Sequence, residues 1–491
     1  MGIIVWAAEP NTRKRECHVY LQEQRDDMFN KLKIVFFIGL MALIFIVGMG
    51  VAHFQLFPYQ YLLGLRTSPV LEPLKNLVRY TAGSPDAIPA YIKNTALQRL
   101  LIKEVPLEKY PVSSSTYIVE AAGILHVVST HGKFISFDLN SYERVESELP
   151  PVPMNLDKLI DSPLVGGISF AENHFRVLGV YTETDNKGKD QLYVTHHQYD
   201  DKGDCVSLAV SRLELNGEPE TGDWETLFTP EPCMRTRVGQ DGETQRFHIR
   251  QTTGGAMTSY GEDNILFSVG DYGFDGMIHE SLSNLPESMF GKIYRLNKRT
   301  GEATVFAEGF RNPQGLYTDK EGTVWATDHG PYGGDELNII REEDNYGWPE
   351  VTYGIEYGNK AWPHNPEQGK HEGFQKPEFV WMNAIAPTDI LRLESTDSFK
   401  EWLGDLLIVS LLNRSLHRVR IGEDNRAIYS ESIEIGHRIR NMQLLSNGAV
   451  ALMTDGKVLI IIQDGGAVYE PESVQVKDRL EDLNRYDSFM E

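Results

Sequence analysis

The side chains best suited to chemistry are concentrated in one block of this sequence. Arg311 and Asn312 stand in the turn G-F-R-N-P-Q-G, directly before a strand-like run, where their polar ends can reach a bound ligand. Shortly after, the glycines and proline of residues 330–334 bend the backbone, and such bends can turn carbonyl oxygens inward. Asp335 and Glu336 follow, and carbonyl and carboxylate oxygens are the ligands that calcium takes. The block predicts a ligand pocket beside a calcium site, unless the two carboxylates only cap or pair within turns.

Several motifs in and around this block resemble those of the PQQ-dependent sugar dehydrogenases, the family that oxidises aldoses, glucose or sorbosone with pyrroloquinoline quinone. The shared runs, in order, are R-N-P-Q-G, H-G-P, D-N-Y-G-W-P, V-T-Y-G-I-E-Y-G, H-R-I-R-N and L-M-T-D-G-K-V. From about residue 245 to 462 the resemblance rests on these motifs. From about 115 to 245 it rests only on the general pattern of short strand-like runs separated by turns. It implies an all-β, six-bladed β-propeller with PQQ and calcium as cofactors.

The resemblance also assigns roles to single residues. Arg311 and Asn312 would face the cofactor, and Arg438 and Arg440 would bind the PQQ carboxylates. Paired guanidiniums suit a tri-carboxylate quinone because Arg binds carboxylates through bidentate, charge-assisted hydrogen bonds. The family's Asp after the second of these arginines is Asn441 here.

Two calcium sites are implied by the same resemblance. The calcium of the cofactor would be held partly by the main-chain carbonyls of Gly330 and Pro331. A second, structural calcium of some members would use the positions Glu336, Tyr346, Thr352 and Glu356, where the carboxylates are retained.

Two departures from the family weigh against ordinary catalysis. The histidine base falls on Thr252, and a hydroxyl takes a proton from a sugar C1–OH near neutral pH only with help. His248, four residues upstream, is a candidate replacement base. The PQQ-contacting lysine is Leu412, and Arg414 is a candidate for the lost charge. Thr252 and Arg311 remain the predicted catalytic positions. Arg311 would stabilise the negative charge that develops during the reaction.

Three functions stay open on these residues. The first is an oxidoreductase that oxidises a CH–OH group of a sugar or polyol by hydride transfer to the quinone. The second is a propeller that binds a sugar or another anionic ligand without turnover. The third is a scaffold in an envelope assembly. The retained arginines favour a pocket that holds an anion, whereas fold-level analogy alone does not decide among functions.

Short strands must position these residues. From residue 113 to 465, apolar or alternating runs are separated by Gly, Asn and Asp turns at roughly ten-residue spacing, which is typical of a propeller. Long helical periodicity is lacking there, so an α/β fold is excluded. Residues 55–112, with a helical stretch such as 96–102, predict a stalk or cap, and 466–491 predict a polar tail.

An uncharged apolar run, residues 34–51, precedes the propeller and at about 1.5 Å per residue just spans a hydrocarbon core. Basic residues precede it, and none follows until Arg66. We therefore expect residues 1–33 in the cytoplasm, an uncleaved transmembrane helix at 34–54, and the propeller in the periplasm or outside the cell. A cleaved signal peptide that starts at Met28 is the alternative.

Charge and cysteines bound the partners and the compartment. Lys and Arg number 47 against 70 Asp and Glu, a net charge of −23, which excludes nucleic acid as a natural partner. The expected partners are a small sugar or polyol and the membrane, and a homodimer is left open. Cys205 and Cys233 flank two strand-like runs on the exported side, which predicts a disulfide, with two unpaired buried thiols as the alternative.

The histidines give weaker signals. His196 and His197 stand on a predicted strand, where a hydrogen-bonded surface pair is expected rather than a metal site. His364 and His371 lie in a loop rich in Pro, Gly and Asn, residues 359–376, which either has a purely structural role or roofs a ligand cleft.

Overall fold

In the computed structural model, the described residues begin at Ile88. The described ranges are 88–107, 117–146, 149–161, 175–203, 205–215, 223–230, 233–235, 252–277, 281–283, 285–364, 370–394, 398–455 and 457–467. No helix in these ranges is long and apolar enough to cross a membrane. The expected cytoplasmic segment, the expected anchor at 34–54, His248 and most of the polar tail lie outside the described residues.

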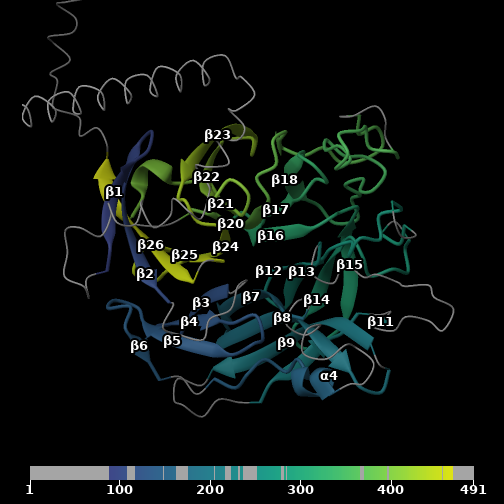
Figure 1. Ribbon diagram of the computed structural model, residues 1–491, viewed down its shortest axis with the longest axis horizontal. Helices are drawn as coiled ribbons and strands as arrows, with labels where there is room; N and C mark the ends of the chain where they lie inside the picture. The colour runs from purple at the N-terminus through teal and green to yellow at the C-terminus, as the bar shows by residue number, and fades with distance from the viewer. Residues whose placement is uncertain are drawn as a thin grey trace, which may run out of the picture. The chain divides into compact units, whose positions relative to one another are not determined.

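Six antiparallel sheets form the blades of a β-propeller, which confirms the predicted all-β fold (Figure 1). The first blade contains β3 (Tyr117–Ala121), β4 (Ile124–Val128), β5 (Phe134–Asp138) and β6 (Arg144–Val145). The second contains β7 (Val177–Thr184), β8 (Asp190–Asp200), β9 (Cys205–Leu215), β10 (Glu225–Phe228) and β11 (Met234–Arg235), with helix α4 (Leu156–Asp161) before it in the chain. The third contains β12 (Gly254–Tyr260), β13 (Asn264–Val269), β14 (Lys292–Asn297) and β15 (Ala303–Glu308).

The remaining blades follow the same order from the centre outward. The fourth contains β16 (Pro313–Thr318), β17 (Val324–Asp328), β18 (Asp335–Ile340) and β19 (Phe379–Trp381). The fifth contains β20 (Pro387–Arg392), β21 (Leu406–Ser410), β22 (Ser415–Ile421) and β23 (Ala427–Glu434), with the 3-10 turn η1 (Lys400–Trp402). The closing blade contains β24 (Ile439–Leu444), β25 (Val450–Thr454), β26 (Val458–Ala467), β2 (Gln98–Pro106) and β1 (Ala90–Asn94).

The first strand of each blade lies innermost, and neighbouring inner strands contact one another around a closed ring. Hydrogen bonds link the blades: Ile118 N–H donates to Asn441 Oδ1 at 2.8 Å, and Thr388 Oγ1 donates to the Ile439 carbonyl at 2.8 Å. The residues just before the inner strands therefore gather at one end of the ring. This end carries the motif residues predicted above.

The closing blade corrects one prediction. The stretch that suggested a helical stalk around residues 96–102 is a strand, because β2 pairs antiparallel with β26 and β1 pairs with β2. The fully buried side chains of Leu100 and Ile102 alternate along β2 and pack with the closing blade. Strands from both ends of the described chain thus complete one sheet, which leaves no gap in the ring.

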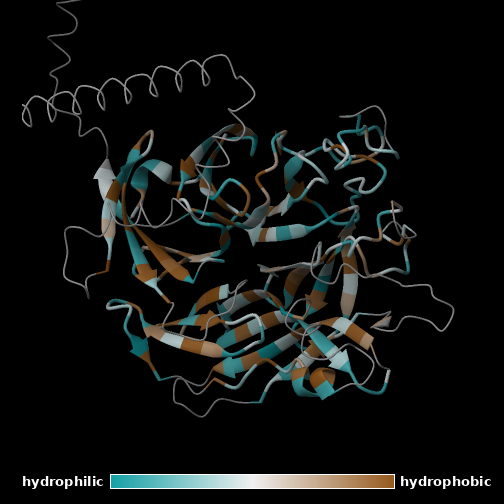
Figure 2. Ribbon diagram, viewed as in Figure 1, coloured by the Kyte–Doolittle hydropathy of each residue, from teal (hydrophilic) through white to brown (hydrophobic). Residues whose placement is uncertain are grey.

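Apolar side chains fill the spaces between adjacent sheets. Trp325, which is fully buried, packs with Leu337 and Ile408 between the fourth and fifth blades. Figure 2 shows hydrophobic residues distributed along the strands of all the blades. Each blade therefore buries both faces, as expected of a propeller whose sheets pack face to face.

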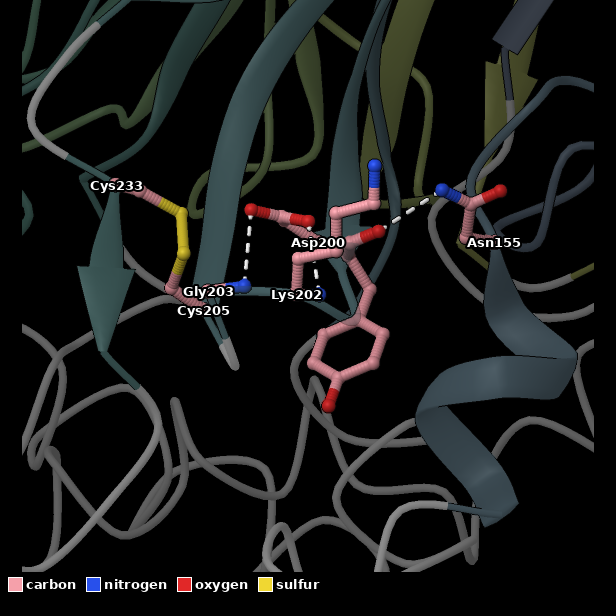
Figure 3. Close-up of a disulfide and its surroundings, with 7 residues drawn as sticks. Asn155, Asp200, Lys202, Gly203, Cys205 and Cys233 are labelled. Carbon is pink, nitrogen blue, oxygen red and sulfur yellow. Dashed lines mark hydrogen bonds between the residues drawn. A yellow bond between two sulfur atoms is a disulfide. The ribbon is translucent and has the colours of Figure 1, made fainter.

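The predicted disulfide is present, with Cys205 Sγ and Cys233 Sγ 2.04 Å apart (Figure 3). It joins the start of β9 to the residue before β11, which pairs with β9. Asp200 shapes the turn before Cys205, because its carboxylate accepts from the N–H groups of Lys202 at 3.0 Å and Gly203 at 3.1 Å. A Cβ on Gly203 would lie 2.9 Å from Cys205 Sγ, so a glycine is needed there.

Candidate active site

The predicted site residues meet where the inner strands begin and the second strands end. Arg311 and Asn312 precede β16, Thr252 precedes β12, and Arg438 precedes β24. Three carboxylates lie at or just after the ends of the second strands of their blades: Asp271, Asp328 and Asp455. None of these carboxylates was predicted as a site residue, and each lies beside a predicted side chain.

Arg311 lies at the centre of this arrangement. Its Nη1 donates to the Gly330 carbonyl at 3.0 Å, and its Nη2 lies 3.5 Å from the Tyr357 hydroxyl. The guanidinium carbon stacks over the Trp348 ring at 5.5 Å, a cation–π contact. Although burial lowers the pKa of Arg311, the charge of Asp271 reverses that effect and leaves it above its ordinary value.

Asp271 is a fully buried carboxylate beside Arg311. Its Oδ2 accepts from Trp348 Nε1 at 2.8 Å and its Oδ1 from the Gly273 N–H at 2.8 Å. Burial raises the pKa of Asp271 to about 6, and the opposing effect of the Arg311 charge is the smaller of the two. A carboxylate with this pKa is ionised at neutral pH yet able to accept a proton.

Thr252, the position of the family base, lies close to the Asp271 carboxylate and contributes to its pKa. No hydrogen bond of standard geometry joins them, because Thr252 Oγ1 is buried without a partner among the described residues. Thr252 has a left-handed backbone, φ 51°, which is strained for a β-branched residue. Strain at this position is consistent with a functional role for the residue.

Asp328 and Asn312 fix the backbone of the same site. Asp328 accepts from the N–H groups of Arg311 at 2.9 Å and Asn312 at 2.6 Å. Burial raises the pKa of Asp328 to about 7. The Asn312 side chain, also buried, accepts from the Gly254 N–H at 3.1 Å through Oδ1. Asn312 therefore ties the fourth blade to the turn that carries Thr252.

Arg438 and Arg440 share one carboxylate. Arg438 Nε donates to Asp455 Oδ2 at 3.1 Å, and Arg440 Nε donates to Oδ1 at 3.2 Å. The charges of Arg440 and Arg438 hold the pKa of Asp455 below its usual range although burial opposes them. Two guanidiniums on a single carboxylate leave one uncompensated positive charge, which suits an anionic ligand.

A further arginine at this end of the ring was not predicted. Arg176 directly precedes β7, and its N–H donates to His197 Nδ1 at 3.3 Å. Burial raises the pKa of Tyr117, and the charges of Arg440 and Arg176 both oppose that rise. A cation before a predicted inner strand, as in the motif with Arg311, is the sequence signal that could have identified Arg176.

The expected calcium carbonyls are only partly available. The Gly330 carbonyl accepts from Arg311, and the Gly330 N–H donates to Asp335 Oδ1 at 3.0 Å. Asp335 Oδ2 accepts from the N–H groups of Ile385 and Ala386, each at 2.7 Å. Asp335 therefore braces the Gly330–Pro331 turn. Calcium at this turn would share the Gly330 oxygen with Arg311 or displace its hydrogen bond.

Two side chains at the positions expected for a structural calcium form hydrogen bonds within the protein. The Tyr346 hydroxyl donates to the Ile339 carbonyl at 2.6 Å, and Thr352 Oγ1 accepts from the Gly354 N–H at 3.1 Å. Among the described residues, a separate group of three carboxylates within 4.8 Å of one another contains Asp319, Glu321 and Glu394. In that group, Asp319 and Glu321 contact Arg392.

Other predicted positions take up varied surroundings. Leu412, in place of the family lysine, is 57% exposed and carries no charge toward the site. The Arg414 carbonyl accepts from the Ile435 N–H, and its side chain is half-buried. His196 and His197 are fully buried, so the expectation of a surface pair is wrong; their nitrogens bond within the core, for example His196 Nε2 with Ser211 Oγ at 2.9 Å.

Two buried atoms of the site are available to bind PQQ. Arg311 Nε and Thr252 Oγ1 are both buried and lack hydrogen-bond partners within the described part of the chain. A buried donor and a buried hydroxyl, both close to Asp271, and an arginine pair at the same end of the ring can pair with a ligand that carries carboxylate and carbonyl oxygens. The residues present therefore fit the quinone.

Comparisons with known proteins agree with the motifs. The profile of the family described as Glucose / Sorbosone dehydrogenase matches residues 160–462. An uncharacterised protein of Synechocystis is 32% identical over 265 residues, which cover 50% of this chain and 60% of that protein. An aldose sugar dehydrogenase of Escherichia coli is 32% identical over 162 residues, 31% of this chain and 41% of the enzyme. The chain thus matches less than two thirds of either relative's length.

Solved structures share the fold. A crystal structure of a glucose dehydrogenase superimposes with a TM-score of 0.58 at 21% identity, covering 74% of this chain and 99% of that one. The PQQ-bound aldose sugar dehydrogenase of Streptomyces coelicolor superimposes with a TM-score of 0.53 at 21% identity, covering 77% and 99%. At these identities the likeness establishes the propeller alone.

Proposed function

Because the chain belongs to the glucose/sorbosone dehydrogenase family, we propose that it is a PQQ-dependent oxidoreductase acting on a CH–OH group of a sugar or polyol. The observation that carries the proposal is the environment of Arg311. Its buried Nε finds no acceptor among the described residues, while its other nitrogens and its ring contact already fix the guanidinium. A preorganised cation of this kind stabilises negative charge that develops on an oxygen beside it.

The arginines would hold the cofactor. Arg438 and Arg440 carry more positive charge than Asp455 neutralises, so they are suited to the quinone carboxylates, and Arg311 to a carbonyl oxygen. PQQ, when bound, supplies the acceptor for the hydride that leaves the substrate carbon. Calcium at the Gly330 and Pro331 carbonyls would add a second positive charge to the same pocket.

Proton removal is assigned to Thr252 and Asp271 together. The substrate hydroxyl would give its proton to Thr252 Oγ1 as the Thr252 proton passes to the Asp271 carboxylate, so that the threonine ends neutral and the aspartate protonated. A pKa of about 6 keeps Asp271 ionised at neutral pH, which the first step requires. The hydroxyl alone has no such capacity, and this pairing is the help it needs.

The test is calorimetric titration of the full chain in detergent with PQQ, in calcium and again with a chelator. We expect calcium-dependent binding that Arg440→Ala weakens at least about tenfold. The control Arg426→Ala, in the exposed turn between β22 and β23, should leave it unchanged. Reduction of an artificial acceptor in the presence of sugars then reports turnover. No PQQ binding in either condition overturns the proposal.

A binding protein without turnover is the second candidate. The exposed Leu412 in place of a cation, together with the missing histidine base, favours this alternative over a fast enzyme. It predicts that PQQ or an anionic sugar binds through Arg440, while the acceptor is not reduced with any sugar. A scaffold role predicts neither binding nor turnover.

We also propose that residues 34–54 anchor the chain with the propeller on the exported side. The charge asymmetry around the apolar run supports this orientation, and so does a disulfide, which persists in oxidising compartments. Protease added to cells with a permeabilised outer envelope and an intact cytoplasmic membrane should digest the propeller but spare a tag at the N-terminus. Protection of both would contradict the orientation.

A further inference from the structure

His371 is a buried side chain with no satisfied nitrogen. The residue is 2% exposed, and neither Nδ1 nor Nε2 finds a hydrogen-bond partner in the part of the chain that the structure describes. The ring of Tyr353 stacks on it with centroids 4.5 Å apart, which holds the imidazole in place. Buried polar groups in native proteins are nearly always paired, so this imidazole calls for a ligand.

Two residues of β18 carry further oxygen ligands, Glu336 beside the imidazole and Asn338 beside Glu336. The two are two positions apart on one strand, so their side chains lie on the same face. Asn338 Nδ2 donates to Glu336 Oε2 at 3.2 Å, while Asn338 Oδ1 is buried and finds no donor among the described residues. Glu336 Oε1 lies 3.9 Å from His371 Nε2, which is too long for a hydrogen bond.

A shared cation would pair two of these three unpaired atoms, His371 Nε2 and Asn338 Oδ1. An ion between Glu336 Oε1 and His371 Nε2 would be bound at about 2.0–2.2 Å from each after they approach by roughly half an ångström. The amide oxygen of Asn338 is a possible third protein ligand, and water can complete the shell. We propose that Glu336, Asn338 and His371 form a binding site for a divalent transition-metal ion.

The ligand set decides the class of metal. Imidazole nitrogen suits zinc and its neighbours in the first transition row, whereas calcium takes oxygen ligands. The positions expected for a structural calcium share only Glu336 with this set, and the Tyr346 and Thr352 side chains are engaged elsewhere. His371 therefore directs this part of the fold toward a different ion. The inference is independent of whether the chain oxidises a sugar.

The experiment uses the full, untagged chain in detergent, freed of metal with a chelator and then titrated with Zn²⁺ and, separately, with Ca²⁺. We expect one Zn²⁺ site whose affinity falls at least about tenfold in both His371→Ala and Glu336→Gln. Co²⁺ in place of Zn²⁺ should give visible d–d absorption that His371→Ala removes. The matched controls are His364→Ala, an exposed histidine of the same loop, and Glu356→Gln, which should leave Zn²⁺ binding unchanged.

Three outcomes would overturn the site. Zn²⁺ binding that is unaffected by His371→Ala would place the ion elsewhere. Calcium binding that depends on Glu336 and Glu356 but not on His371 would assign the region to an all-oxygen site. If no metal binds, and His371→Gln merely lowers the melting temperature, the histidine is structural. PQQ binding measured on the same variants keeps this result separate from the proposed function.

Discussion

Arg311 Nη1 donates to the carbonyl oxygen of Gly330 at 3.0 Å, so a guanidinium occupies one of the oxygens expected to bind calcium. Asp335 holds the Gly330 N–H from the other side, at 3.0 Å, and keeps the turn in place. Calcium bound at this oxygen would share it with the hydrogen bond or displace it, and the guanidinium charge would repel the ion. Arg311 and calcium are therefore expected to weaken each other's binding to this turn.

Calcium affinity in the absence of PQQ should increase when Arg311 is shortened. Arg311→Ala removes both the competing hydrogen bond and the repulsion between two cations, so we expect calcium to bind at least about threefold more tightly. Calorimetry on the chelator-treated chain measures this. The control Arg414→Ala should change nothing, and weaker calcium binding in Arg311→Ala would contradict the competition.

Thr252 is the position at which activity should respond most strongly. Thr252→His returns the family's base to the site, and general-base catalysis contributes roughly 10²–10⁴-fold, so we expect turnover to rise substantially. Thr252→Val keeps the shape but removes the hydroxyl, so turnover should fall to background, while Thr252→Ser should retain it. Steady-state rates with a sugar and an artificial acceptor measure all three. Equal rates for Val and Thr would exclude the proton relay.

The pH profile should report Asp271. Because burial raises its pKa to about 6, the carboxylate is protonated below that pH and cannot accept a proton. We expect kcat/KM to rise with pH through about 6 and then level off. Asp271→Asn should abolish turnover while PQQ binding through Arg440 persists, measured by calorimetry. An acidic limb that is unchanged in Thr252→His would instead assign it to another group.

The six blades could be predicted because they depend on local signals and ordered motifs, but their closure could not. The sequence A-L-Q-R-L-L-I, residues 96–102, overlaps the start of β2 and does not alternate cleanly between polar and apolar residues. The partner strand β26 lies more than 350 residues away in the chain. Only the tertiary pairing decides that Leu100 and Ile102 face one core. Local propensity was overruled by a long-range sheet.

The site was predicted in its cations but not in its carboxylates. Arg311 and Arg440 stand in recognisable motifs, whereas Asp271 carries no pattern beyond a single acidic letter after a strand. Its importance comes from burial and from Trp348, whose indole N–H reaches it across 77 positions of the chain. The contact of His371 with Glu336 is of the same kind, because loop conformation sets it.

Removing the disulfide should cost stability. Cys205 and Cys233 are 28 positions apart, and by the loop-entropy estimate the bond stabilises the fold by about 3–4 kcal/mol. The double variant Cys205→Ser, Cys233→Ser should unfold at a lower urea concentration. Its unfolding free energy, extrapolated to water, should be lower than that of the wild type by this amount. Reduction of the wild type should reproduce the loss, and reduction of the variant should have no further effect. Equal midpoints would show that the surrounding pairing of β9 and β11 suffices.

Asp389 provides a separate test of burial, outside the proposed proton path. Its carboxylate accepts from the Met442 N–H at 2.9 Å and from Asn441 Nδ2 at 2.6 Å, and burial raises its pKa to about 7. The folded state therefore keeps a proton that the unfolded chain releases near pH 4, so the group's contribution is fully present below that pH. It is lost as pH rises toward about 7, because the unfolded state then binds fewer protons. The side chain of Asp389→Asn cannot titrate, so its contribution to stability does not depend on pH. Between pH 4 and 7, the unfolding free energy of the variant should therefore increase relative to that of the wild type, by up to about 1.4 kcal/mol per pH unit. Urea unfolding at several pH values measures it, and a difference that does not change with pH would show that Asp389 is ionised in the fold.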